Sequence, residues 1–112
     1  MNRNKLIEVF ISNISNAVIH QILEKAIDRK EISEKYQKEV KNSWEIAIKY
    51  REKINPVNRS LSGQDNEEIK RKIVNKVKAE LKIRIERGYE NIDFSIVEDF
   101  VDNALKQMKI MN

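Results

Sequence analysis

The amino-acid sequence predicts an all-α protein, a four-helix, bundle-like domain built from two helical hairpins. Composition is the first reason, because 112 residues include only two glycines and one proline, whereas a sheet protein needs turn residues at short intervals. Periodicity is the second reason. Apolar residues recur at steps of three or four through four separate stretches, as they do on the buried face of a helix. A chain of this length is a usual size for one domain with one core.

One stretch, residues 55–68, interrupts the helical pattern. It contains the proline, Pro56, and one of the two glycines, Gly63, and both residue types disfavour a continuing helix. We therefore expect a single domain over all 112 residues, with a first hairpin at 4–54, a linker at 55–68 and a second hairpin at 69–111.

The first helix, residues 4–27, is apolar on more than one face. Its main stripe is Ile7, Ile11, Ile14, Val18 and Ile22, and further apolar residues widen it or lie opposite: Val9, Phe10, Ala17, Ile19, Leu23 and Ile27. A helix that is apolar on several faces is buried on several faces. A second copy of the chain would cover the extra face, which predicts a homo-oligomer, most simply a two-fold dimer. The alternative is a central helix wrapped by the other three helices of the chain.

The predicted oligomer interface consists of apolar residues of this helix: Ile7, Phe10, Ile11, Ile14, Val18, Ile19 and Ile22. A narrow polar strip of Asn13, Asn16 and His20 separates the apolar faces and lacks the lysines of membrane-surface helices. Residues 9–23 carry no charged side chain, but polar residues interrupt them and a bilayer span needs about 20 apolar residues. We therefore expect no membrane span and a cytoplasmic protein.

The second helix is expected to end near Ile54. The apolar period breaks between Asp28 and Ser33, where Asp28 and Glu31 have the spacing of a capping box. The buried stripe of this helix is Tyr36, Val40, Trp44, Ala47, Arg51 and Ile54. Because no glycine or proline marks the break, one long helix over residues 4–54 is the alternative to a hairpin.

The third helix is predicted to follow a second capping box, Asp65 to Glu68. Its buried stripe is Ile69, Ile73, Val77, Leu81 and Ile85. Gly88 lies where a left-handed C-terminal cap belongs. Residues 81–85 also alternate as a strand would, but no second convincing strand is available to pair with them, so the helix is favoured.

The last helix has two candidate N-caps, Asp93 and Ser95, and the second of these forms a capping box with Glu98. Its buried stripe is Val97, Val101, Ala104, Met108 and Met111, widened by Phe100 and Leu105. Acidic residues near its start and lysines near its end suit the helix dipole.

Several kinds of site are excluded by residue type. The chain has no cysteine and one histidine, His20, so cysteine–zinc sites, thiol nucleophiles and multi-histidine metal sites cannot form within one chain. His20 and Glu24 are one helical turn apart, but two ligands do not make a metal site. No glycine-rich phosphate loop or nucleophile motif is present. We therefore expect no catalytic residues and no cofactor.

Charge is segregated between the last two helices. Residues 69–87 hold eight basic and two acidic side chains, whereas residues 88–112 hold five acidic and two basic ones. Candidate contacts to nucleic acid or to an acidic partner are the basic residues Arg71, Lys72, Lys76, Lys78, Lys82 and Arg84. The alternative is a solvated face that the acids of the last helix partly neutralise.

These observations predict a small interaction or regulatory protein that acts by protein–protein association rather than by catalysis. Its expected partners are a second copy of the chain and an unidentified protein. The alternative function is nucleic-acid binding through the basic helix at 69–87.

Overall fold

The computed structural model describes residues 2–27, 29–55, 63–108 and 110, and within them the prediction of an all-α fold is confirmed. The elements are α1 (Arg3–Ala26), α2 (Lys30–Ile54), α3 (Gly63–Glu86), a 3₁₀ turn η1 (Phe94–Ile96) and α4 (Val97–Gln107). No strand occurs among these residues.

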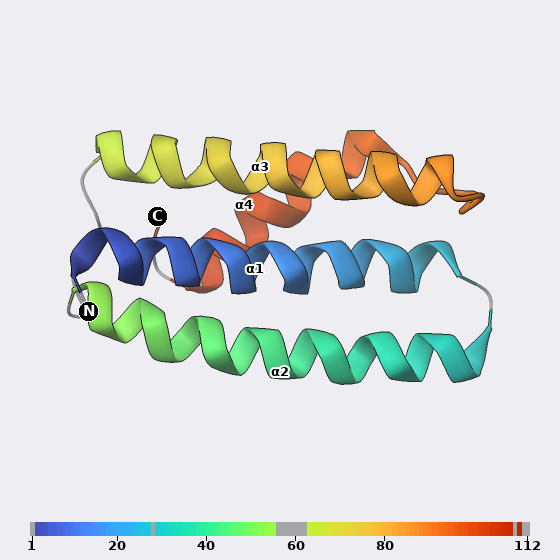
Figure 1. The fold of residues 1–112 in the computed structure, drawn as a ribbon, viewed down its shortest axis with the longest axis horizontal. Coiled ribbons are helices and arrows are strands. Elements are labelled where there is room, and N and C mark those ends of the chain that lie inside the picture. The colour runs from blue at the N-terminus through green and yellow to red at the C-terminus, as the bar shows by residue number, and fades with distance from the viewer. Residues whose placement is uncertain (1, 28, 56–62, 109, 111–112) are drawn as a thin grey trace.

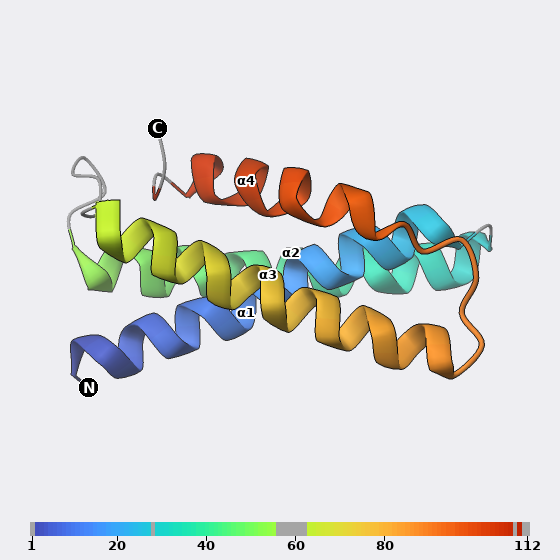
Figure 2. The ribbon, with the colours of Figure 1, turned by 90° about the horizontal axis from the view of Figure 1, so that it is seen from above.

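The helix α1 is the centre of the arrangement. It packs most extensively on α2, and it also contacts α3 and α4 (Figure 1). The helix α2 runs antiparallel to α1, and α4 runs back along α3. Viewed from above, α1 and α3 cross, so that their N-terminal halves diverge from one another (Figure 2).

Because of this arrangement, the chain encloses α1 with its own helices. Six of the seven residues of the predicted oligomer interface are buried within the chain, and Ile7 is half-buried. Burial of each such side chain contributes about 1.5–3 kcal/mol relative to exposure. The central-helix alternative therefore accounts for the apolar faces of α1 without a second copy, while homo-oligomerisation itself stays a prediction.

By length and composition, α1 is also long and apolar enough to span a membrane, alone among the helices in the described ranges. Just over half of the residues in its most apolar stretch are buried inside the fold. A core helix that is covered on several sides passes the same test, because both environments select apolar residues.

The chain between α1 and α2 forms a hairpin rather than one long helix. Ile27 leaves the helical conformation with φ −104° and ψ 128°, while its amide still donates to the carbonyl of Leu23 at 3.1 Å. The predicted cap Asp28 lies outside the described residues. The residue that precedes α2, Arg29, makes no side-chain capping bond.

The predicted start of α3, after a capping box at Asp65 to Glu68, is wrong. The helix begins at Gly63, so these residues lie inside its first turns and do not cap it. Asp65 binds Arg3 and Glu68 binds Lys72 instead. Acidic side chains in a first turn interact favourably with the helix dipole, which explains why the helix extends back through them.

At the start of the last helical segment, one of the two predicted caps, Asp93, is found as a cap, whereas the end of α4 differs from the prediction. Asp93 accepts hydrogen bonds from the amide of Ser95 at 2.9 Å and from its hydroxyl at 2.7 Å. Asp93 thus caps the 3₁₀ turn, and Ser95 is a donor rather than the N-cap. The helix ends at Gln107, earlier than expected, with the amide of Ile110 bound to the carbonyl of Leu105 at 2.9 Å.

The predicted cap at Gly88 is confirmed. This glycine has φ +100°. The amide of Tyr89 donates to the carbonyl of Arg84, and the amide of Gly88 donates to the carbonyl of Ile85. These two bonds define a Schellman motif. The alternating residues 81–85 are accordingly helical.

Arg51 is buried, as its place in the predicted stripe of α2 requires, with a relative exposure of 2%. Its Nε donates to the carbonyl of Met108 at 2.9 Å, and its Nη1 donates to both oxygens of Asn55. Burial lowers the pKa of this guanidinium. The side chain therefore ties the end of α2 to the end of α4.

Candidate interhelical groove and basic face

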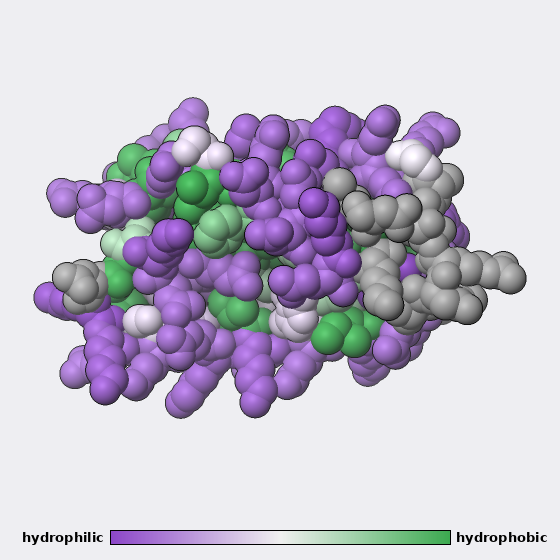
Figure 3. All heavy atoms as spheres, turned by 180° about the vertical axis from the view of Figure 1, so that it is seen from behind, coloured by the Kyte–Doolittle hydropathy of each residue, from purple (hydrophilic) through white to green (hydrophobic). Residues whose placement is uncertain are grey.

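A groove opens where α1 and α3 diverge. It consists of two adjoining cavities of about 840 Å³ and about 500 Å³, both lined by α1 and α3 and both bordered by Lys76. We call these the first and second cavities of the α1–α3 groove. The face that carries α4 is different, because its apolar side chains lie in separate patches among polar ones (Figure 3).

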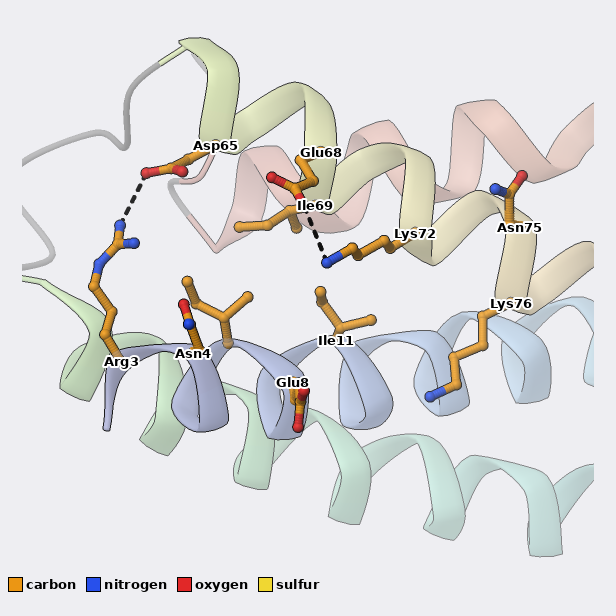
Figure 4. A pocket seen from close by; sticks show the side chains of 11 residues that line it. Arg3, Asn4, Glu8, Ile11, Asp65, Glu68, Ile69, Lys72, Asn75 and Lys76 are labelled. Atoms are coloured by element: carbon orange, nitrogen blue, oxygen red, sulfur yellow. Dashed lines mark hydrogen bonds and ion pairs between the residues drawn. The ribbon is translucent and has the colours of Figure 1, made fainter. Parts of the chain in front are cut away.

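The first cavity has an apolar floor and a charged rim. Ile11 points from α1 toward α3, and Ile69 points from α3 toward α1 (Figure 4). An ion pair between Arg3 and Asp65, 2.9 Å long, bridges the two helices at the outer end. Ile7 also lines the floor.

The second cavity is more polar. Its α1 wall consists of Ser12, Asn13, Ser15, Asn16, Ile19 and His20. Asn13 donates to the carbonyl of Val9 at 2.9 Å, and Asn16 donates to the hydroxyl of Ser43 on α2 at 2.6 Å. Ser15 is buried, and its hydroxyl has no hydrogen-bond partner among the described residues.

His20 lies at the inner end of the groove, and its ring contacts residues of both α1 and α2. Its Nδ1 lies 2.8 Å from the carbonyl oxygen of Asn16, and its Nε2 lies 2.6 Å from a carboxylate oxygen of Glu39 on α2. Both ring nitrogens thus face oxygen acceptors. In the part of the chain that the structure describes, no group of three or more histidine or carboxylate side chains is placed to hold a metal ion.

Two tyrosines link the hairpins next to this histidine. The hydroxyls of Tyr36 and Tyr89 are 3.0 Å apart, and the guanidinium of Arg84 lies 5.6 Å from the centre of the Tyr89 ring. Burial, together with the hydrogen bond to Tyr89, raises the pKa of Tyr36 to about 12. The hydrogen bond between the two hydroxyls, together with the nearby Arg84, lowers the pKa of Tyr89.

The fold divides the six basic candidates between two surfaces. Lys72, Lys76 and Arg84 line the groove. Arg71, Lys78 and Lys82 lie within about 40° of one another around α3, on the flank away from the groove, since successive helical residues are about 100° apart. We call this second set the basic flank.

The basic flank is not neutralised by α4. All three of its side chains are exposed, and none makes an ion pair with another described residue. The acidic residues of α4 supply one interhelical ion pair to α3 within the described ranges, between Lys70 and Asp102 at 3.0 Å. The hydrogen bond from Lys70 to Asp102 raises the pKa of Lys70. Lys70 is not one of the six basic candidates.

The groove itself was not predicted from the sequence. The polar residues Ser12, Asn13, Ser15 and Asn16 within an otherwise apolar helix are the sequence feature that marks its second cavity. The divergence of α1 from α3, which opens the first cavity, depends on helix crossing and has no comparable mark in the sequence.

The fold and this site define an all-α, bundle-like protein with an open interhelical groove. No protein-family model, no curated protein and no solved structure matches the chain.

Proposed function

We propose that the protein acts by binding another protein, without catalysis, and that the α1–α3 groove holds a helix of that partner. The observation that carries the proposal is the first cavity, in which an apolar floor of Ile7, Ile11 and Ile69 is bordered by charged side chains. An apolar centre with a polar border is the usual composition of a helix-binding groove.

The dimensions of the groove support this kind of ligand. Its α1 wall extends from Arg3 to His20, which corresponds to about 25 Å at 1.5 Å per residue. A helix of four to five turns has about the same length. The exposed Ile83 in the second cavity continues the apolar floor toward the inner end.

The experiment compares two isoleucine variants. Ile7→Glu places a charge on the groove floor, whereas Ile46→Glu places it on an exposed position of α2 outside the groove. A partner isolated with the wild-type chain and then purified should bind Ile46→Glu with unchanged affinity and Ile7→Glu at least about tenfold more weakly, equivalent to about 1.4 kcal/mol. Circular dichroism confirms that both variants are folded, and equal binding by all three proteins would exclude the groove.

The predicted homo-oligomer is tested with the same proteins. Since most apolar side chains of α1 are buried by the chain's own helices, a second copy would use the open groove rather than these buried side chains. Light scattering after size exclusion gives the mass of each variant. A dimeric mass that Ile7→Glu halves and Ile46→Glu preserves would identify the partner as a second copy.

A second candidate function, nucleic-acid binding, is favoured by the cations of the basic flank, which make no ion pair with another described residue. Each cation that neutralises a phosphate steepens the fall of affinity with salt by about 0.9 logarithmic units per tenfold rise. The variant Arg71→Glu/Lys78→Glu/Lys82→Glu should therefore lose binding to a labelled duplex. The matched control Lys38→Glu/Lys41→Glu/Lys49→Glu changes three exposed lysines of α2. Equal losses in both variants, or retained binding by the first, would contradict a role of the basic flank.

A further inference from the structure

We propose that Lys76, together with the hydroxyl of Ser15, recognises an acidic side chain of the helix that occupies the groove. This inference rests on the proposed function and specifies the chemistry of the partner: an amphipathic helix with one aspartate or glutamate near its middle, set among apolar residues.

The charges around the groove give the first argument. Arg3 is paired with Asp65 at 2.9 Å, Lys72 with Glu68 at 3.1 Å, and Arg84 with Glu80 at 3.2 Å. The other ionisable groups that border it, Glu8 and His20, contact Lys5 and Glu39. Lys76 alone among the described charged groups of the groove has no ionic partner, although the lining as a whole is balanced, with four basic and four acidic side chains.

The position of Lys76 gives the second argument. It borders both cavities, and its side chain reaches from α3 toward α1 across the groove (Figure 4). This ammonium without a described ionic partner therefore lies near the middle of the groove, between the apolar floor of the first cavity and the polar wall of the second. An acidic residue near the middle of a partner helix would lie opposite it.

Ser15 gives an independent argument. Its side chain is 1% exposed, it lines the second cavity with Lys76, and its hydroxyl has no partner within the described residues. A buried hydroxyl without a hydrogen bond is unfavourable and is normally satisfied. The hydroxyl oxygen is covered in the unoccupied groove, so the Ser15 side chain must rotate outward before a carboxylate can accept a hydrogen bond from it and one, strengthened by charge, from the ammonium of Lys76.

Two synthetic peptides test the inference. Each is a helix of about 17 residues with isoleucines along one face, and they differ only in a central glutamate or glutamine. Amide spectra of the isotopically labelled protein measure weak binding and show which residues are contacted. Both peptides should shift the amide resonances of residues in α1 and α3 along the groove. The glutamate peptide should bind about fivefold more tightly than the glutamine peptide, because a charged acceptor strengthens the hydrogen bonds.

Variants attribute this preference to its source. Lys76→Met should abolish the fivefold difference, and Ser15→Ala should reduce it. Lys78→Met removes another exposed lysine of α3, on the basic flank, and should leave the difference unchanged. Lys76 is exposed, so Lys76→Met is expected to fold, and circular dichroism checks this for all variants.

The possible outcomes separate the two proposals. If both peptides bind the groove with equal affinity in the wild type, the inference about Lys76 is wrong and the groove is still the docking site. If the preference is lost equally in Lys76→Met and Lys78→Met, it reflects overall charge and the inference is also wrong. If neither peptide shifts amides of the groove, the proposed docking site itself is contradicted.

Discussion

Arg51 shows how one buried side chain can determine the position of a whole helix end. Replacing it with methionine keeps most of the volume but removes the donors to Met108 and Asn55. Loss of one partner from buried hydrogen bonds costs about 1–3 kcal/mol, so Arg51→Met should lower the free energy of unfolding by that amount. Urea denaturation measures it, with Arg71→Met, an exposed arginine of α3, as the control.

The same variant should have a local effect on α4. The amides of Met108 and Ile110 bind carbonyls at the end of this helix. If Arg51 fixes that end, their hydrogen exchange should accelerate more in Arg51→Met than exchange at the start of α4. Uniform acceleration along α4 would instead show that the arginine contributes only to global stability.

The tyrosine pair gives a prediction about pH. Because the pKa of Tyr36 is raised from 10.0 to about 12, the folded state holds this proton more tightly than the unfolded chain. Its contribution to stability is therefore complete below about pH 10 and is lost as the pH rises toward about 12. The lowered pKa of Tyr89 acts in the opposite direction and reduces the net effect.

Tyr36→Phe should accordingly weaken the decline of stability between about pH 10 and about pH 12 relative to the wild type. It also removes the hydrogen bond to Tyr89 and should raise the pKa of Tyr89, which ultraviolet absorbance of the phenolate measures. Tyr50→Phe is the control. An unchanged Tyr89 titration in Tyr36→Phe would contradict the linkage between the two hydroxyls.

At the scale of helices, Gly88 is the clearest test of how α3 ends. With φ +100°, any other residue is strained there, although an added Cβ would meet no described atom within 4 Å beyond the adjoining residues. Gly88→Ala should therefore destabilise the protein by about 1–2 kcal/mol through backbone conformation alone. Gly63→Ala, at the helical start of α3, should instead stabilise it by about 0.4–1 kcal/mol. Similar effects of both changes on thermal unfolding would contradict the assigned cap.

Helix type and most of each helix face could be predicted because they depend on residues close in sequence, but the expected burial of Ile85 in the stripe of α3 is wrong, since this side chain is 39% exposed. The break between α1 and α2, the buried stripe of α2 with Arg51, and the cap at Gly88 all have local causes. The start of α3 could not be predicted in the same way, because Asp65 has two favourable uses. A capping box joins residues that are close in sequence, whereas the ion pair of Asp65 with Arg3 joins residues 62 positions apart.

The candidate site was predictable only in part for the same reason. The sequence identified the basic residues but not their division between the groove and the basic flank, which depends on where α1 and α4 pack against α3. It likewise identified the several apolar faces of α1 but could not decide whether a second copy or the chain's own helices cover them.

At the scale of the whole molecule, this last choice can be measured. A core helix that its own chain encloses needs no second copy to fold, so the unfolding midpoint should not change over a roughly hundredfold range of protein concentration. If two copies had to share α1, dissociation would accompany unfolding and the midpoint would rise with concentration. Ile14→Ala, at a fully buried position of α1, should lower stability by about 2–5 kcal/mol. Because this change lies inside one chain, the lowered midpoint should be equally independent of concentration, whereas a midpoint that rises with concentration in both proteins would show that two copies share α1.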